Sequence, residues 1–454
     1  MRRLVLALAL TFLSSAAVGG EVQIVRGRLI ENLSARADAT QTYTLYLPNA
    51  YDPAKRQPLL FVFDPRGRGT AAAEIFRPAA EEYGWILISS NQTQSDGSNE
   101  PNERALRALV PEAGVYATDP NRLYATGFSG TAMLSYLLGI VTGKLAGVIA
   151  VGGRVVSGAE PAKFSFAHYG FSGDRDFNNR EMRLIDTILD REGKRPHRFR
   201  SFSGVHSWIS PELARDAIGW MEVVAKNRAV VPKVFGEDLA AARDLKGLAA
   251  LRHYRAIVRT YEGLVPLDEV RSRVNALEAD ASVRKELAEE TKWDEFERRY
   301  QLDVLAKVPS IMADLRAEES PAIASDAARA FRVGDLLRHA SRPGAEGAAA
   351  TRLLESVYAQ LVHGITAQLF SRQQYALATA ILGAATTIHP ERWSCWYNLG
   401  AAYALLGNSR QAYGALDKAI AAGFGDAASL EADTDFASLR RDKRFAELLG
   451  RMRQ

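Results

Sequence analysis

"ATGFSGTAML", residues 125–134, predicts a β-strand that runs through a sharp turn directly into an α-helix. Ser129 lies at the turn, with Gly127 two residues before it and Gly130 directly after it. So sharp a turn strains the backbone of its central residue and requires small neighbours. Thr131 departs from the Gly-x-Ser-x-Gly form of this pattern but is still compact. Two interpretations are open at this point: Ser129 is a nucleophile, or it is a structural serine in a glycine-flanked turn.

The stretches on either side of this turn alternate between β-rich runs and runs of helical spacing, from residue 22 to about residue 225. Such alternation predicts a largely parallel sheet that is covered by helices. The first two β-rich runs are joined without a helix and therefore fit an antiparallel edge. The β-rich runs are 42–48, 58–63, 85–90, 122–128, 146–153, 164–171 and 197–202, and the helical runs between them are 70–84, 102–117 and 179–193.

Two loops downstream of Ser129 carry the side chains that a nucleophilic serine needs. "GFSGDRDFNN", residues 170–179, follows one predicted strand with two aspartates, and "SGVHSW", residues 203–208, follows the next with His206. The carboxyl ends of parallel strands meet at one edge of a sheet, and the order Ser, acid, His along the chain is that of a catalytic triad on such a sheet. This order favours Ser129 as the nucleophile and His206 as the general base.

Two aspartates compete for the role of the acid. Asp176 stands at a Gly-x-x-Asp spacing that resembles the acid loop of serine hydrolases, whereas Asp174 directly follows the glycine. Asp174 is also suited to cap the turn or the helix that follows it. We therefore predict a triad of Ser129, Asp176 and His206, with Asp174 as the alternative acid.

Residues 40–208 resemble the α/β-hydrolase superfamily, and within it the secreted carboxylesterases related to feruloyl esterases and polyhydroxyalkanoate depolymerases. "YTLYLPNAYDPAKRQPLLFVFDPRGRG", residues 43–69, is similar to the two leading strands and the oxyanion loop of these enzymes. The resemblance implies an α/β-hydrolase core that hydrolyses a carboxylic ester through a Ser-His-Asp triad, with no metal and no organic cofactor. Little room for a large lid is left before the acid loop, so we expect an open site for bulky or polymeric esters.

The chain departs from this resemblance at the oxyanion loop. Where the relatives carry a His-Gly pair after the third strand, this chain has Asp64-Pro65. Proline has no amide hydrogen, so the resemblance assigns the two oxyanion donors to the amides of Arg66 and Gly130. "DPRGRG" also fits an ordinary turn, and it lacks the Gly-Lys-Ser/Thr ending of a phosphate-binding loop. Arg66 and Arg68 would favour an acidic group on the substrate.

Two other functions remain open. The same triad also cleaves amides, so a serine peptidase is one alternative. The departures at Asp64-Pro65 and at Thr131 favour the other, a catalytically inactive hydrolase-like scaffold that acts through the helical half of the chain. A probe that reacts only with activated serines distinguishes an enzyme from such a scaffold.

The second half of the chain has no strand signals, and its apolar residues recur at helical spacing. "WYNLGAAY", residues 396–403, has the spacing of the first helix of a tetratricopeptide (TPR) repeat, and a weaker copy lies one repeat length earlier. The repeats are clearest at 359–426, and a generic helical hairpin is the alternative. We therefore predict an α/β-hydrolase domain at 21–228 and an all-α, TPR-like domain at 229–454. The second domain is expected to bind a protein partner or to pack onto the first.

The first twenty residues have the form of an export signal. Arg2 and Arg3 precede a short apolar core, Leu4–Phe12, and small residues follow as a cleavage zone near Gly20. A membrane anchor is the alternative, but a span requires about 18 apolar residues. We therefore predict a signal peptide at 1–20, a periplasmic or secreted mature protein, and no membrane span after cleavage.

Composition narrows the remaining classes of function. The 454 residues are 47% hydrophobic and 24% charged, which is typical of a globular protein of two or three domains. A net charge of +4 without a long basic run gives no support to nucleic-acid binding. Cys395 is the only cysteine, so the chain forms no internal disulfide, and cysteine catalysis or a cysteine-based zinc site has no support.

Overall fold

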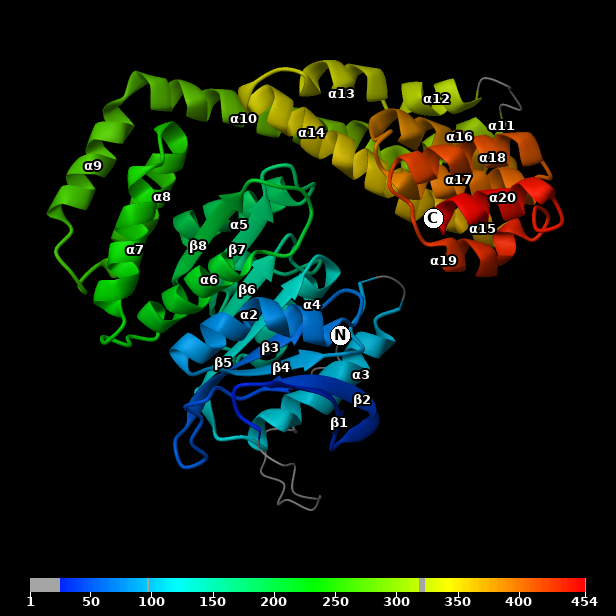
Figure 1. The fold of residues 1–454 in the computed structure, drawn as a ribbon. Helices are drawn as coiled ribbons and strands as arrows, with labels where there is room; N and C mark the ends of the chain where they lie inside the picture. Colours follow the sequence, from blue (N-terminus) through cyan, green and yellow to red (C-terminus); the bar gives the residue numbers. More distant parts are fainter. Residues whose placement is uncertain (1–24, 96–97, 318–322, 454) are drawn as a thin grey trace. The chain divides into compact units, whose positions relative to one another are not determined.

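The computed structural model describes residues 25–95, 98–317 and 323–453 (Figure 1). The chain forms two compact units, which divide between Leu287 and Ala288. All β-strands of the described residues lie in the first unit, whereas the described elements of the second unit are helices. The predicted signal peptide, residues 1–20, lies outside the described residues. Across the described parts of the chain, no helix combines the length and the apolar character that a membrane crossing requires.

The first unit is built on an eight-stranded sheet with the strand order β1-β2-β4-β3-β5-β6-β7-β8. β2 pairs antiparallel with β1 and β4, and all pairs from β4 to β8 across the sheet are parallel. The predicted α/β core, with a mostly parallel sheet and an antiparallel edge, is therefore confirmed. The strands are β1 (Leu29–Ala35), β2 (Asp38–Tyr46), β3 (Gln57–Phe63), β4 (Ile86–Ser90), β5 (Thr118–Phe128), β6 (Gly147–Val151), β7 (Ala167–Gly173) and β8 (His197–Phe202).

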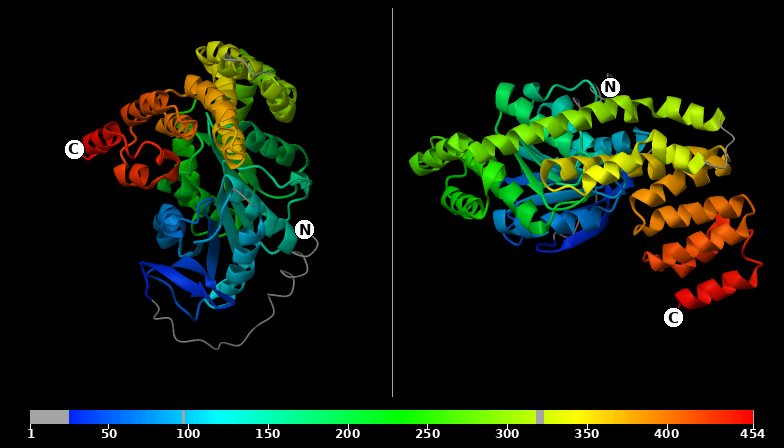
Figure 2. Two further views of the ribbon diagram at one scale, coloured as in Figure 1. Left: turned by 90° about the vertical axis from the view of Figure 1, so that its right-hand side faces the viewer. Right: turned by 90° about the horizontal axis from the view of Figure 1, so that it is seen from above.

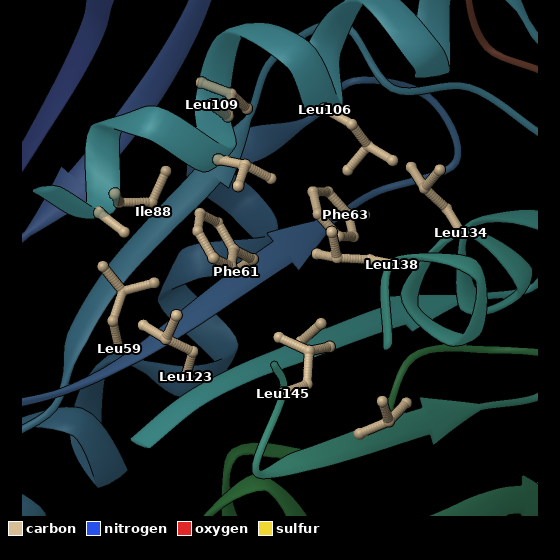
Figure 3. Packing of buried hydrophobic residues seen from close by; sticks show 14 of the residues in the cluster. Leu59, Phe61, Phe63, Ile88, Leu106, Leu109, Leu123, Leu134, Leu138 and Leu145 are labelled. Carbon is tan, nitrogen blue, oxygen red and sulfur yellow. The ribbon is translucent and has the colours of Figure 1, made fainter. Parts of the chain in front are cut away.

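Side chains of the central strands alternate between two layers of the core. On β3, Leu59, Phe61 and Phe63 pack on the side of α3, α4 and α5 (Figure 3), whereas Leu60 and Val62 pack on the side of α2 and α6. This alternation is the two-residue period of a strand whose faces are both buried. Helices thus cover both faces of the sheet (Figure 2). They are α2 (Gly69–Tyr83), α3 (Glu100–Leu109), α4 (Gly130–Thr142), α5 (Asn179–Glu192) and α6 (Pro211–Val224).

The helices that follow the last strand are tied to the sheet by a buried ion pair. Arg198 on β8 is 1% exposed, and its guanidinium donates to both carboxylate oxygens of Asp238 at 2.9 and 2.6 Å. The Tyr261 hydroxyl donates to the same carboxylate at 2.9 Å. The predicted junction at 228/229 therefore falls inside the first unit, which also contains α7 (Val231–Arg243), α8 (Gly247–Tyr261) and α9 (Asp268–Ala279).

Removal of this ion pair should destabilise the first unit strongly. In Asp238→Ala the Arg198 guanidinium stays buried without its partner, and loss of one member of a buried pair costs about 3–5 kcal/mol of the free energy of unfolding. Glu237→Ala is the matched control, because Glu237 is 43% exposed and pairs with Arg215 at the surface. That loss should cost at most about 1 kcal/mol. Guanidinium denaturation of both variants measures the difference, and equal costs would contradict this account of the unit.

The second unit begins within α10 (Ala281–Asp303), which crosses the division between the units. "WYNLGAAY" lies on α17, and the buried Leu399 and Gly400 pack against α18 as the predicted hairpin requires. The earlier copy is less regular, because the first half of its first helix is a π-helical turn, η4 (Gln360–Ile365), which continues directly into α15. The helices are α11 (Val308–Ala317), α12 (Ile323–Ala330), α13 (Val333–Ala340), α14 (Gly344–Ala359), α15 (Thr366–Ser371), α16 (Tyr375–Ile388), α17 (Trp393–Leu405), α18 (Ser409–Ala421), α19 (Ala427–Ala432) and α20 (Lys443–Met452).

Candidate active site

Ser129 occupies the sharp turn between β5 and α4 that the sequence predicts. Its backbone has φ 57° and ψ −126°, a conformation that costs a non-glycine residue energy. A side chain at Gly127 would collide with the carbonyl group of Thr131, and one at Gly130 would place its Cβ 2.5 Å from the Cβ of Ser95. The two glycines therefore permit the turn, and the turn holds Ser129 at the carboxyl edge of the sheet.

Thr131 stabilises the turn in place of the usual glycine. It is fully buried, and its hydroxyl lies 2.6 Å from the carbonyl oxygen of Phe63 and 2.8 Å from that of Phe128. The amide of Phe128 also donates to this hydroxyl at 3.2 Å. The threonine thus links the turn to the end of β3, and it is compatible with the backbone geometry that a nucleophilic serine requires.

The structure brings Ser129, His206 and Asp176 into one hydrogen-bonded chain. Nε2 of His206 lies 2.9 Å from Oγ of Ser129, and Nδ1 lies 3.0 Å from each carboxylate oxygen of Asp176. Asp176 is 0% exposed and also accepts the amide of Asn178 at 2.8 Å. The three side chains follow β5, β8 and β7, whose carboxyl ends lie at one edge of the sheet.

Aromatic rings flank the imidazole of His206. The ring centre of Phe128 lies 4.5 Å from it and that of Phe177 lies 4.3 Å from it. Phe128 directly precedes Ser129, and Phe177 directly follows Asp176. The two rings that restrict the imidazole are therefore sequence neighbours of its two hydrogen-bond partners. These contacts hold the ring in the plane that lets one nitrogen face the serine and the other face the aspartate.

Asp174, the alternative acid, lies on the same loop but has a different partner. Its carboxylate accepts the amide of Gly204 at 3.0 Å, and its side chain is 52% exposed. Gly152 beside the acid was not found from the sequence. Its φ is +51°, and a Cβ there would lie 2.6 Å from Oδ2 of Asp176, so this glycine makes room for the buried carboxylate. A lone glycine after a strand carries no signal that would have identified it.

The two predicted oxyanion donors differ in their surroundings. Gly130 is the first residue of α4, and the first amides of a helix have no partner within the helix. The amide of Arg66 instead donates to Oδ1 of Asp64 at 2.8 Å. Ser95 places the Arg66 loop beside the turn. Its side chain lies against Gly130, and its amide donates to the carbonyl oxygen of Pro65 at 3.0 Å.

A cavity of about 600 Å³ lies beside the Arg66 loop. It is lined by residues 65–67 and 91–94, with Gln41 and Arg104 among its other walls. Arg104 pairs with Asp38 at 2.6 Å. The lining of the cavity is therefore mixed, with polar side chains beside a similar amount of apolar surface. Among the described residues, no group of three or more His, Cys, Asp or Glu side chains is arranged to hold a metal ion.

Comparison with known proteins gives similarities to solved structures alone. No family model and no curated protein matches the chain. Fluorophosphonate-binding serine hydrolase F of Staphylococcus aureus is 16% identical, with 43% of this chain and 99% of that chain covered and a TM-score of 0.37. A hyperthermophilic esterase from the archaeon Pyrobaculum calidifontis is 13% identical, with 45% of this chain and 87% of that chain covered and a TM-score of 0.37. A ferulic acid esterase is 13% identical, with 44% of this chain and 100% of that chain covered and a TM-score of 0.36.

Proposed function

We propose that this protein is a serine hydrolase that cleaves carboxylic esters. The observation that carries the proposal is the hydrogen-bonded chain Ser129–His206–Asp176 on a strained turn at the carboxyl edge of a parallel sheet. Nε2 of His206 accepts the hydroxyl proton as Oγ of Ser129 attacks the ester carbonyl carbon. His206 then returns that proton to the leaving alcohol, and the acyl group stays on Ser129. In the second step His206 takes a proton from a water molecule as that water attacks the acyl carbonyl carbon. His206 then returns the proton to Oγ of Ser129, and the carboxylic acid leaves.

The buried acid supports the proton transfers at His206. Asp176 accepts Nδ1–H, which directs the lone pair of Nε2 toward Ser129, and its negative charge stabilises the imidazolium that forms. The amide of Gly130 is the donor that best fits the developing oxyanion, and one such donor contributes about 3–4 kcal/mol. The Arg66 amide would have to leave Asp64 to take the second position.

The local energetics favour an enzyme over an inactive scaffold. A non-glycine residue at positive φ and a fully buried carboxylate each lower the stability of the fold. Features with such a cost are expected where a function requires them. Ser129 and Asp176 carry these two features and are joined through one histidine. Thr131 and Asp64, the departures from the usual pattern, both form hydrogen bonds that stabilise the site. A scaffold has no need for this combination.

Export and partner binding belong to the same proposal and are supported by the sequence. The apolar segment Leu4–Phe12 supports a cleaved signal at 1–20 and a periplasmic or secreted enzyme. The α17–α18 hairpin supports a TPR-like region that binds a protein partner. The cavity beside the Arg66 loop supports a substrate that extends beyond the scissile ester.

A matched pair of substrates distinguishes an esterase from a peptidase. The purified protein should hydrolyse p-nitrophenyl butyrate readily and the corresponding p-nitroanilide at least about a thousandfold more slowly, since an amide needs more stabilisation of its tetrahedral intermediate and the Arg66 amide, the predicted second donor, is bonded to Asp64. Release of the chromophore measures both reactions, with Ser129→Ala as the background. Comparable kcat/KM values on the two substrates would favour the peptidase. Absence of turnover on both would favour the scaffold.

A further inference from the structure

Asp64 forms the densest set of side-chain hydrogen bonds next to the site. It directly follows β3 and is 1% exposed. Its carboxylate accepts five hydrogen bonds, from the amides of Arg66 and Arg68, twice from the Arg68 guanidinium, and from the indole nitrogen of Trp208. Burial by itself would raise the pKa of Asp64, but these donors outweigh it and hold the pKa below its usual range. The carboxylate is therefore ionised and fully paired.

One side of this cluster holds the loop that carries the general base. Residues 203–210 have no regular secondary structure, so side chains must fix their path. Trp208 lies two residues after His206, and its indole nitrogen donates to Oδ2 of Asp64 at 2.9 Å. Its ring also packs on Phe128 at 5.6 Å, the residue that precedes Ser129 and contacts His206. Displacement of Trp208 would therefore move the histidine and the nucleophile relative to each other.

The other side of the cluster holds the loop next to the predicted oxyanion position. The amides of Arg66 and Arg68 donate to Oδ1 of Asp64 at 2.8 and 3.2 Å, and the Gly67 amide donates to its carbonyl oxygen at 3.2 Å. In the same loop, the carbonyl oxygen of Pro65 accepts a hydrogen bond from the amide of Ser95. The Asp64 carboxylate thus connects the Arg66 loop with the His206 loop, because it accepts hydrogen bonds from both.

We propose that Asp64 is a positioning residue, which holds the Arg66 loop and the His206 loop in the register that the Ser129–His206 contact requires. The inference rests on the proposed hydrolase function and deepens it. The aspartate that stands in place of the usual histidine is then part of the catalytic geometry of this chain. Its effect passes through Trp208 to His206, and it touches neither substrate nor the reacting atoms.

The test compares Asp64→Asn, Trp208→Phe and their double variant on an activated ester. Asn has the size of Asp but presents an amide group to hydrogen-bond donors. We expect kcat of Asp64→Asn to fall about a hundredfold with little change in KM, as a displaced catalytic group produces. Trp208→Phe keeps a ring and loses only the donor, so its decrease should be smaller, about tenfold. The double variant should equal Asp64→Asn, because both changes break the same connection.

Asp238→Asn is the matched control, since Asp238 is also a buried carboxylate held by an arginine and an aromatic side chain. It should lower the melting temperature yet leave kcat per folded molecule within about twofold, as expected for an independent site. In protein labelled with ¹⁵N-tryptophan, the indole resonance that Trp208→Phe removes should shift in Asp64→Asn and stay in place in Asp238→Asn. If Asp64→Asn does not fold, Trp208→Phe alone must still show the loss in kcat.

The inference is wrong if folded Asp64→Asn keeps kcat within about twofold of the wild type. It is equally wrong if the indole resonance of Trp208 does not move, or if the losses in the two single variants multiply in the double variant. An inactive wild-type protein would instead contradict the proposed hydrolase function, so the two failures are distinguishable.

Discussion

Replacing Ser129 or His206 by alanine should reduce kcat on an activated ester by about five to six orders of magnitude. Ser129 supplies the attacking oxygen, and His206 Nε2, 2.9 Å from it, is the group that accepts the proton. Because the two act as a unit, the double variant should be no slower than either single variant. Initial rates of p-nitrophenyl ester hydrolysis, corrected for the spontaneous reaction, measure all three variants.

Ser135→Ala is the control for this comparison. Ser135 is a buried serine on α4, and among the described residues its hydroxyl donates only to the carbonyl oxygen of Thr131, at 3.3 Å. Its replacement should keep kcat within about twofold, because a small change in packing of this kind costs little. Turnover by Ser129→Ala at a substantial fraction of the wild-type rate would exclude Ser129 as the nucleophile.

Asp176→Asn should reduce kcat by about four orders of magnitude, whereas Asp174→Asn should change it by less than about tenfold. Asp176 is fully buried and accepts Nδ1–H of His206, so an amide in its place favours the wrong tautomer of the imidazole. Asp174 is half exposed and accepts the amide of Gly204, so its loss affects only the path of the loop.

The two asparagine variants are matched in chemistry and lie two residues apart on one loop, so their kinetics can be compared directly. Circular dichroism and melting temperature should show both of them folded. The reverse order of kcat would mean that Asp174 is the acid and that the loop rearranges when substrate binds.

The geometry that the sequence predicts well is the part set by strand ends. Ser129, Asp176 and His206 each follow a strand of a parallel sheet, and the carboxyl ends of such strands lie at one edge. Their order along the chain was therefore enough to predict that they meet. Spacing alone predicts Asp176 as the acid rather than Asp174. In the structure the Asp176 carboxylate lies beside Gly152 and His206, whereas the Asp174 side chain is 52% exposed.

The parts that the sequence did not reveal depend on partners far apart in the chain. Asp64-Pro65 indicated only a missing amide donor, because the indole of Trp208 that pairs with Asp64 lies 144 residues later. The Arg66 amide, which the resemblance assigns to the oxyanion, donates instead to Asp64 only two residues earlier, a local contact that the sequence does not reveal either. Arg198 and Asp238 each look like ordinary surface charges in their own segments, and only the fold shows that they form a buried pair across the predicted junction.

Reaction with a fluorophosphonate probe, followed by mass mapping of the labelled peptide, tests the central claim most directly. An activated serine attacks phosphorus and keeps the phosphonyl group, whereas an unactivated serine does not react. The wild-type protein should carry one adduct, on Ser129 in the peptide that links β5 to α4, and Ser129→Ala should carry none. A folded wild-type protein that stays unlabelled, or an adduct on a different residue, would contradict the assignment of this turn as the catalytic centre.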